Sequence, residues 1–185
     1  MAQVRPRGGR PPKRVREVEP VFCAMGGPAG TRLLPDTALA AAYLRRLGFG
    51  EEEAASLAVG KPFSAEGASP KELLSELVRR HVLRVPFENL EQHDFAGEAA
   101  TPLYERLGRL ADVRRLVERL AFGHRGGFCF DLNPAFAWLL RALGANVRLG
   151  MAWVATAESE TGYTPTATHC LIFVDLPEGP VLVDP

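Results

Sequence analysis

Residues 125–133 have the sequence RGGFCFDLN, which joins a pair of glycines to a cysteine and then to the start of a helix. The glycines lack a Cβ, so the backbone here can turn sharply and let another segment approach closely. After the cysteine, Asn133 and Pro134 are typical of a helix N-cap and of the first helical position. A thiol near a helix N-terminus feels the positive end of the helix dipole, which predicts a lowered pKa and a nucleophilic thiolate at Cys129.

The helix after this motif is indicated by apolar residues at helical spacing. They are Ala135, Phe136, Leu139, Leu140 and Leu143, with Gly144 as the stop signal. If the helix already begins at Cys129, Pro134 lies one turn inside it and removes a backbone hydrogen bond. We therefore expect a kinked or irregular first turn at Cys129 and regular helix from Pro134 onward.

The composition is that of a soluble globular protein with a core. Of the 185 residues, 46% are apolar and 24% are charged, and the formal net charge is zero. This balance gives no reason to expect a nucleic-acid or membrane partner, and no apolar run approaches the roughly 18 residues of a membrane span. Three cysteines (Cys23, Cys129 and Cys170) are too few and too scattered for a disulfide framework, which favours a reducing compartment and a cytoplasmic location.

The charge is unevenly placed along the chain. Residues 1–30 carry six basic and two acidic residues, together with five prolines and five glycines, and we predict a disordered basic tail here. The basic cluster is compatible with a nuclear address, a nucleic-acid contact or an organelle transit peptide. Glu17, Glu19 and the lack of serine argue against the transit peptide. The simpler interpretation is a solvated tail or a misassigned start.

The segment before the motif is predicted to be mostly helical. Ser69, Pro70 and Glu72 form the strongest start signal, with an N-cap, a proline at the first helical position and a capping box. Apolar stripes and stop signals place the helices at residues 36–48, 51–59, 69–85 and 112–122.

The pattern changes to β-structure after residue 145. Strands are predicted at residues 146–154, 168–174 and 181–183, with a turn at residues 176–180. The predicted fold class is therefore α+β. A helical domain over residues 31–145 carries the cysteine, and an incomplete antiparallel β-barrel or sheet follows over residues 146–185.

Two polar residues at strand ends are candidates for the partners of a nucleophilic thiol, which needs a base and a group that orients the base. His169 begins one strand and Asp184 ends the next. A hairpin with a four-residue loop over residues 175–178 would place them opposite one another on one face. A loop centred one residue later would move Asp184 along the strand or to the other face. Each residue alone is more often a surface polar residue or a turn former.

The quoted motif resembles the nucleophile motif of the arylamine N-acetyltransferases. In that family the acidic residue two places after the cysteine is most often glutamate, and Asp131 takes its place here. The sequence VPFENL at residues 85–90 resembles a second segment of the family, and the order of cysteine, histidine and aspartate is also similar. The resemblance covers about residues 35–185 and implies a papain-like core.

The resemblance implies an acetyltransferase with Cys129, His169 and Asp184 as its catalytic triad. Acetyl-CoA would be the co-substrate, without a metal. The acetyl group would pass to a small aromatic amine, an arylhydroxylamine or a hydrazine, as in the cytoplasmic metabolism of xenobiotics.

Four further residues have implied roles. Glu88 would pair with Arg125 and hold the cysteine loop, although a surface pair of this kind contributes little stability. Phe87 and Phe128 would line the acceptor pocket.

The end of the chain departs from the family. Family members continue well past the catalytic aspartate, whereas Pro185 follows Asp184 directly. We therefore expect a truncated barrel with an unpaired edge and an impaired activity. One alternative is an inactive truncated relative that serves as an interaction protein. Another is a papain-like thiol amidase or amide synthase, which would not depend on CoA. A zinc site is disfavoured, because the cysteines and histidines lack ligand-pair spacing.

Overall fold

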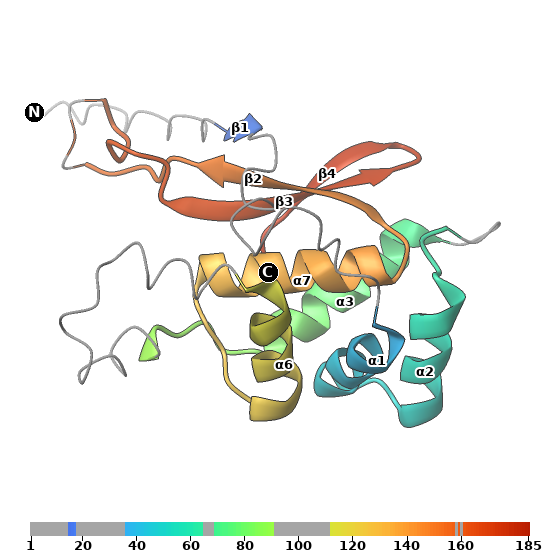
Figure 1. Cartoon of the computed structure of the whole chain (residues 1–185). Coiled ribbons are helices and arrows are strands. Elements are labelled where there is room, and N and C mark those ends of the chain that lie inside the picture. Colours follow the sequence, from blue (N-terminus) through green and yellow to red (C-terminus); the bar gives the residue numbers. More distant parts are fainter. Residues whose placement is uncertain (1–14, 18–35, 65–68, 91–111, 158, 160) are drawn as a thin grey trace, which may run out of the picture.

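The computed structural model describes residues 15–17, 36–64, 69–90, 112–157, 159 and 161–185. Within these ranges the chain is a mixture of helices and one antiparallel sheet (Figure 1). The helices are α1 (Thr37–Arg46), α2 (Glu51–Gly60), α3 (Pro70–Arg84), α6 (Val113–Gly123) and α7 (Cys129–Ala142). In the part of the chain that is described, no helix has both the length and the apolar character needed to cross a membrane.

The sheet has the strand order β1-β2-β3-β4. Its strands are β1 (Val15–Glu17), β2 (Asn146–Ala152), β3 (His169–Leu176) and β4 (Gly179–Val183), and each neighbouring pair is antiparallel. The predicted α+β class is therefore present, with the change from helices to strands between α7 and β2.

Helix α7 lies at the centre of the fold, between the sheet on one side and α1 and α6 on the other (Figure 1). Most of its side chains are buried. The buried apolar cluster extends from Leu39 in α1 through Phe136 and Leu140 in α7 to Ile172 in β3 and Val183 in β4. The helices and the sheet therefore share one continuous core, and the helix that carries the cysteine runs through it.

The start of α7 differs from the prediction. The helix is continuous from Cys129, its N-cap is Phe128, and Pro134 lies in its interior. The Phe128 carbonyl accepts hydrogen bonds from the N–H groups of Asp131 (2.8 Å) and Leu132 (2.9 Å), which closes a helical turn ahead of the proline. Pro134 has no N–H to donate to the carbonyl of Phe130, four residues earlier, yet the helix continues through it, so the expected N-cap at Asn133 is corrected to Phe128.

The prediction of a disordered tail over residues 1–30 is also wrong for residues 15–17. They form β1, in which Val15 pairs with Ala152 and Glu17 pairs with Gly150. This pairing occupies backbone groups that β2 would otherwise leave unpaired at its edge. The rest of the predicted tail lies outside the described residues.

The register of the β3–β4 hairpin shows which of the two predicted loops joins these strands. Leu176 pairs with Gly179 and Ile172 pairs with Val183, so the loop is centred one residue later than a loop over residues 175–178. Gly179 has a φ of +123°, a conformation that side chains rarely adopt. This shift moves the pairing by two residues and leaves Asp184 on the same face as His169, as its diagonal neighbour.

Candidate active site

Cys129 is the first residue of α7 and only 8% of its surface is exposed. Its Sγ lies 4.0 Å from the carbonyl oxygen of Thr168 and accepts hydrogen bonds from the backbone N–H groups of Cys170 and Phe130. Thr168 and Cys170 are the two neighbours of His169 in the chain. The fold therefore places the thiol against the backbone on both sides of the predicted base.

Burial raises the pKa of the Cys129 thiol above its ordinary value. The hydrogen bonds from the N–H groups of Cys170 and Phe130 act in the opposite direction, and the negative charge of Asp184 adds to the increase. The sequence predicted a lowered pKa from the helix dipole, so this prediction is wrong in direction. The reason is physical: removing the thiolate from water costs more than the helix N-terminus recovers.

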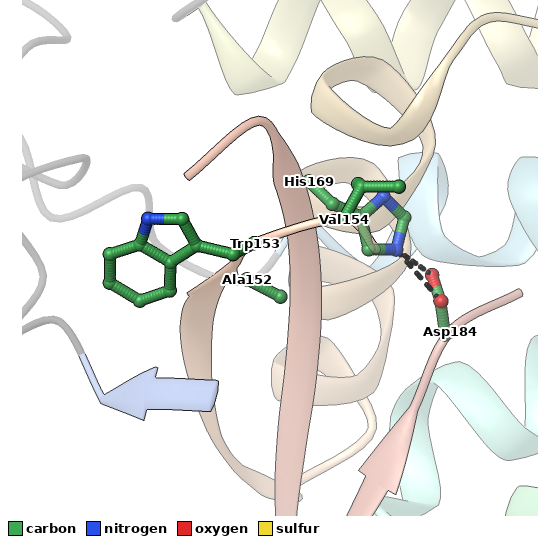
Figure 2. A pocket seen from close by; sticks show the side chains of 5 residues that line it. All are labelled: Ala152, Trp153, Val154, His169 and Asp184. Atoms are coloured by element: carbon green, nitrogen blue, oxygen red, sulfur yellow. Dashed lines mark hydrogen bonds and ion pairs between the residues drawn. The ribbon is translucent and has the colours of Figure 1, made fainter. Parts of the chain in front are cut away.

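His169 and Asp184 form a close pair beside this thiol. His169 Nε2 lies 2.9 Å from Oδ1 and 2.8 Å from Oδ2 of Asp184 (Figure 2). Both side chains are partly exposed. Because the Nε2 hydrogen is directed at the carboxylate, the other ring nitrogen is the one that can accept a proton. The structure thus brings together the histidine and the aspartate that the sequence proposed.

Glu88 binds the loop that precedes Cys129. Its Oε1 lies 3.3 Å from Arg125 Nε and 3.3 Å from the N–H of Gly126, and its Oε2 accepts the N–H of Leu90 at 2.6 Å. Burial raises the pKa of Glu88, but the hydrogen bonds from Leu90, Arg125 and Gly126 outweigh burial and leave the pKa below its usual value. The ion pair expected from the resemblance is present, and its importance for the loop remains a prediction.

The two glycines of the motif allow the loop to lie directly against residues 86–88. Phe87 and Gly127 form a parallel bridge, in which Gly127 N donates to Pro86 O at 3.3 Å and Glu88 N donates to Gly127 O at 2.8 Å. A Cβ on Gly126 would lie 1.8 Å from the Pro86 oxygen, and one on Gly127 would lie 2.6 Å from the Asp131 Cβ. Close approach of the backbone therefore requires both glycines.

Asp131 fixes the first turn of α7 from inside the protein. Its Oδ2 accepts the N–H of Phe128 at 3.1 Å, and its Oδ1 lies 3.6 Å from the guanidinium of Arg119 in α6. Burial raises the pKa of Asp131, and the N–H of Phe128 and the charge of Arg119 oppose this increase. The acidic residue of the motif therefore caps the helix that carries the cysteine.

Asn133 is a site residue that the sequence analysis missed. It is fully buried, and its Nδ2 donates to the carbonyl of Cys170 at 2.6 Å and to Asp184 Oδ1 at 3.1 Å. The sequence could have indicated Asn133 through its place in the motif. It lies four residues after Cys129, which puts both side chains on one face of the helix. Its resemblance to an N-cap concealed this position.

A small cavity lies beside the histidine and the aspartate. It is lined by Ala152, Trp153, Val154, His169 and Asp184. Figure 2 shows Val154 next to the His169 ring and the Trp153 indole directed to the other side. Trp153 and Val154 were not predicted as site residues, because only the pairing of β2 with β3 brings them here.

The two predicted pocket phenylalanines lie at the bridge between the loop and residues 86–88. Phe87 is 70% exposed, and Phe128 is half-buried with its ring 5.6 Å from that of Phe130. Neither lines the cavity beside His169, so their contact with an acceptor stays a prediction. Among the residues that the structure describes, no cluster of three or more histidine, cysteine or acidic side chains could hold a metal ion.

Comparison with known proteins connects this arrangement to one family. The family model described as N-acetyltransferase matches residues 72–185. An arylamine N-acetyltransferase, a pineal gland isozyme of Gallus gallus, is 32% identical over 113 residues, which are 61% of this chain and 35% of that protein. The arylamine N-acetyltransferase / N-hydroxyarylamine O-acetyltransferase of Salmonella typhimurium is 34% identical over 118 residues, which are 64% of this chain and 37% of that protein.

A solved structure shows the same similarity. The arylamine N-acetyltransferase from Salmonella typhimurium matches with a TM-score of 0.54 and 26% sequence identity, over 80% of this chain and 44% of that chain. This chain therefore spans between 35% and 44% of the length of these relatives.

Proposed function

The chain belongs to the arylamine N-acetyltransferase family, and on this premise we propose that it transfers an acetyl group from acetyl-CoA, through Cys129, to an arylamine, an arylhydroxylamine or a hydrazine. The observation that carries the proposal is the pair of contacts between His169 Nε2 and Asp184, 2.9 and 2.8 Å long, beside the helix N-terminus that bears the thiol. A nucleophile on a helix with its base and acid on neighbouring strands is the papain-like arrangement, which we propose for this core.

The first half-reaction forms an acetyl-enzyme. The free ring nitrogen of His169 takes the proton of Cys129 Sγ, and Asp184 holds the imidazole and stabilises its positive charge. The thiolate attacks the carbonyl carbon of the thioester, and the bond between this carbon and the sulfur of CoA breaks. CoA leaves with the proton from His169.

The second half-reaction passes the acetyl group on. The amine nitrogen attacks the carbonyl carbon of acetyl-Cys129 and loses a proton to His169, and the bond from that carbon to Sγ breaks. Cys129 takes the proton back as a thiol. This double displacement is ping-pong chemistry.

The raised pKa of Cys129 gives His169 its role. A buried thiol above its ordinary pKa is almost entirely protonated near neutral pH, so the attack depends on transfer of its proton to a base. The surface beside the base includes the Val154 side chain, an apolar group suited to an aromatic acceptor. We propose small organic amines as partners, Phe87 and Phe128 as additional pocket residues, and the cytoplasm as the location.

The test is the intact mass of the purified protein after mixing with acetyl-CoA and no amine. We expect a gain of one acetyl group, which then disappears when aniline is added and acetanilide forms. Cys129→Ala should gain no acetyl group, whereas the matched control Cys170→Ala should be labelled like the wild type. No adduct in folded wild-type protein, or an adduct that persists in Cys129→Ala, would contradict the proposal. Amide hydrolysis without CoA would favour a thiol amidase instead.

A further inference from the structure

Asn133 joins three parts of the proposed site through one amide group. It lies one turn after Cys129 on α7, at a spacing that places both side chains on the same face of the helix. Its Nδ2 donates to the carbonyl of Cys170, the residue after His169 in β3, and to the carboxylate of Asp184, just beyond β4. The helix with the nucleophile and both strands with its partners therefore meet at this side chain.

Two of these contacts converge on a single oxygen. Asp184 Oδ1 accepts from Asn133 Nδ2 at 3.1 Å and from His169 Nε2 at 2.9 Å. Asp184 follows the last residue of β4, so the strand ladder does not hold its side chain. The hydrogen bond from Asn133 gives this carboxylate a second partner, which belongs to the buried part of α7 and is independent of the imidazole.

The burial of Asn133 argues for a specific role. It is 0% exposed, and within the described part of the chain its Oδ1 has no hydrogen-bond partner, whereas its Nδ2 has two. A buried amide that leaves its oxygen unsatisfied destabilises the fold relative to an apolar side chain of similar size. These contacts fit a role for Asn133 as a hydrogen-bond donor through Nδ2, in which its Oδ1 takes no part.

We infer that Asn133 is a positioning residue, which acts through Asp184 to hold the His169 imidazole in place beside Cys129. The inference rests on the proposed function, since it assigns the three residues their roles as nucleophile, base and orienting acid. Loss of the amide lets the Asp184 side chain move. The His169 imidazole, which Asp184 holds, then leaves its position, and the thiol loses the base that accepts its proton.

A double-mutant cycle tests the inference, with the rate and pH profile of Cys129 alkylation by iodoacetamide as the readout. Alkylation needs no acetyl-CoA, so it reports on Asn133 even if acetyl transfer itself fails. Asn133→Ala should lower the rate at pH 7 about tenfold or more, the size expected for a lost hydrogen bond to a charged group, and should move the profile to higher pH. In an Asp184→Ala background the same substitution should change the rate less than about twofold.

The matched control is Asn146→Ala. Asn146 also donates from Nδ2 to an aspartate, Asp175, at 2.7 Å on the same sheet, but on exposed surface away from the site. This variant should keep the wild-type rate and profile. Circular dichroism checks the fold of each variant, and Asn133→Ser replaces Asn133→Ala in the cycle if the alanine variant does not fold. Equal effects in both backgrounds, or an unchanged rate in folded Asn133→Ala, would overturn the inference.

Discussion

At the scale of single residues, a histidine enclosed in the core makes the stability of this protein depend on pH. His81 in α3 is 0% exposed, its Nε2 lies 2.9 Å from the Tyr43 hydroxyl, and its ring lies 4.9 Å from that of Phe136. Burial, together with the positive charge of Arg46, lowers the pKa of His81 to about 4. The folded protein therefore keeps this histidine neutral at pH values where the unfolded chain protonates it.

This difference predicts a pH-dependent stability. Above the ordinary histidine pKa of 6.5 the contribution of His81 is fully present, and it is lost as the pH falls toward about 4, because only the unfolded state gains a proton. The total loss should be roughly 3 kcal/mol in the free energy of unfolding. Urea unfolding between pH 7 and pH 4.5 measures most of this loss, roughly 2 kcal/mol.

The control for this prediction compares how steeply the free energy of unfolding falls with pH in different variants. His81→Leu should have a shallower pH dependence than the wild type, even if the variant is less stable at every pH. His124 is exposed and has a φ of 53°, so His124→Asn, which tolerates this conformation, should retain the wild-type slope. A His81→Leu slope equal to that of the wild type would show that this histidine does not carry the effect.

At the scale of elements, the position of the cysteine depends on how closely its loop lies against the end of α3. The bridge between Phe87 and Gly127, the ion pair of Glu88 with Arg125 and the cap from Asp131 all act on the residues next to Cys129. None of these contacts involves the sheet. The loop therefore holds Cys129 from the helical side, and Asn133 connects α7 to the strands.

Gly126→Ala should disrupt this loop. The new Cβ would lie 1.8 Å from the Pro86 oxygen, which is a backbone atom that cannot move without breaking the bridge. We expect a loss of at least ~2 kcal/mol in stability, as for overpacked core sites, and a much slower acetylation of Cys129. Urea unfolding and the intact-mass assay measure the two effects.

Gly60→Ala is the matched control for Gly126→Ala. Gly60 is the last residue of α2, and nothing lies within 4 Å of the Cβ that alanine would add. This variant should be neutral or more stable by up to about 1 kcal/mol, and should acetylate normally. If the two variants behaved alike, close approach at Gly126 would not be the constraint.

At the scale of the whole molecule, α7 unites the helices and the sheet. The buried cluster passes from α1 through α7 to β3 and β4 without interruption. Arg141 Nη2 also donates to the carbonyl of Val147 at 2.8 Å, which ties the end of α7 to β2. The position of a residue at the site thus depends on packing in both the helices and the sheet.

A shared core predicts a single cooperative unfolding transition. In a Trp138→Phe variant, far-UV circular dichroism follows mainly the helices and Trp153 fluorescence follows the end of β2. The two urea midpoints should coincide, and Phe136→Ala should lower both equally, with a loss of about 3–5 kcal/mol in the free energy of unfolding. Two separate midpoints would instead favour the helical and sheet domains that the sequence predicted.

The sequence by itself determined most of the helices and strands of this protein and the residues of the motif from which a function is proposed. Asp36 caps α1, Pro70 begins α3 and the glycines of the motif make a close approach, because these features depend on neighbouring residues and on allowed backbone conformations. The cysteine, histidine and aspartate were proposed as site residues from similarly short stretches of sequence, and the structure brings the histidine and the aspartate into contact.

Only the tertiary structure decided how these residues meet. Burial reversed the predicted direction of the Cys129 pKa, the β3–β4 register placed Asp184 diagonally from His169, and packing turned Asn133 from an expected N-cap into a link between helix and strands. Strand β1 likewise exists through pairing with β2. Each of these outcomes depends on desolvation or on pairing between distant segments, which local sequence patterns do not encode.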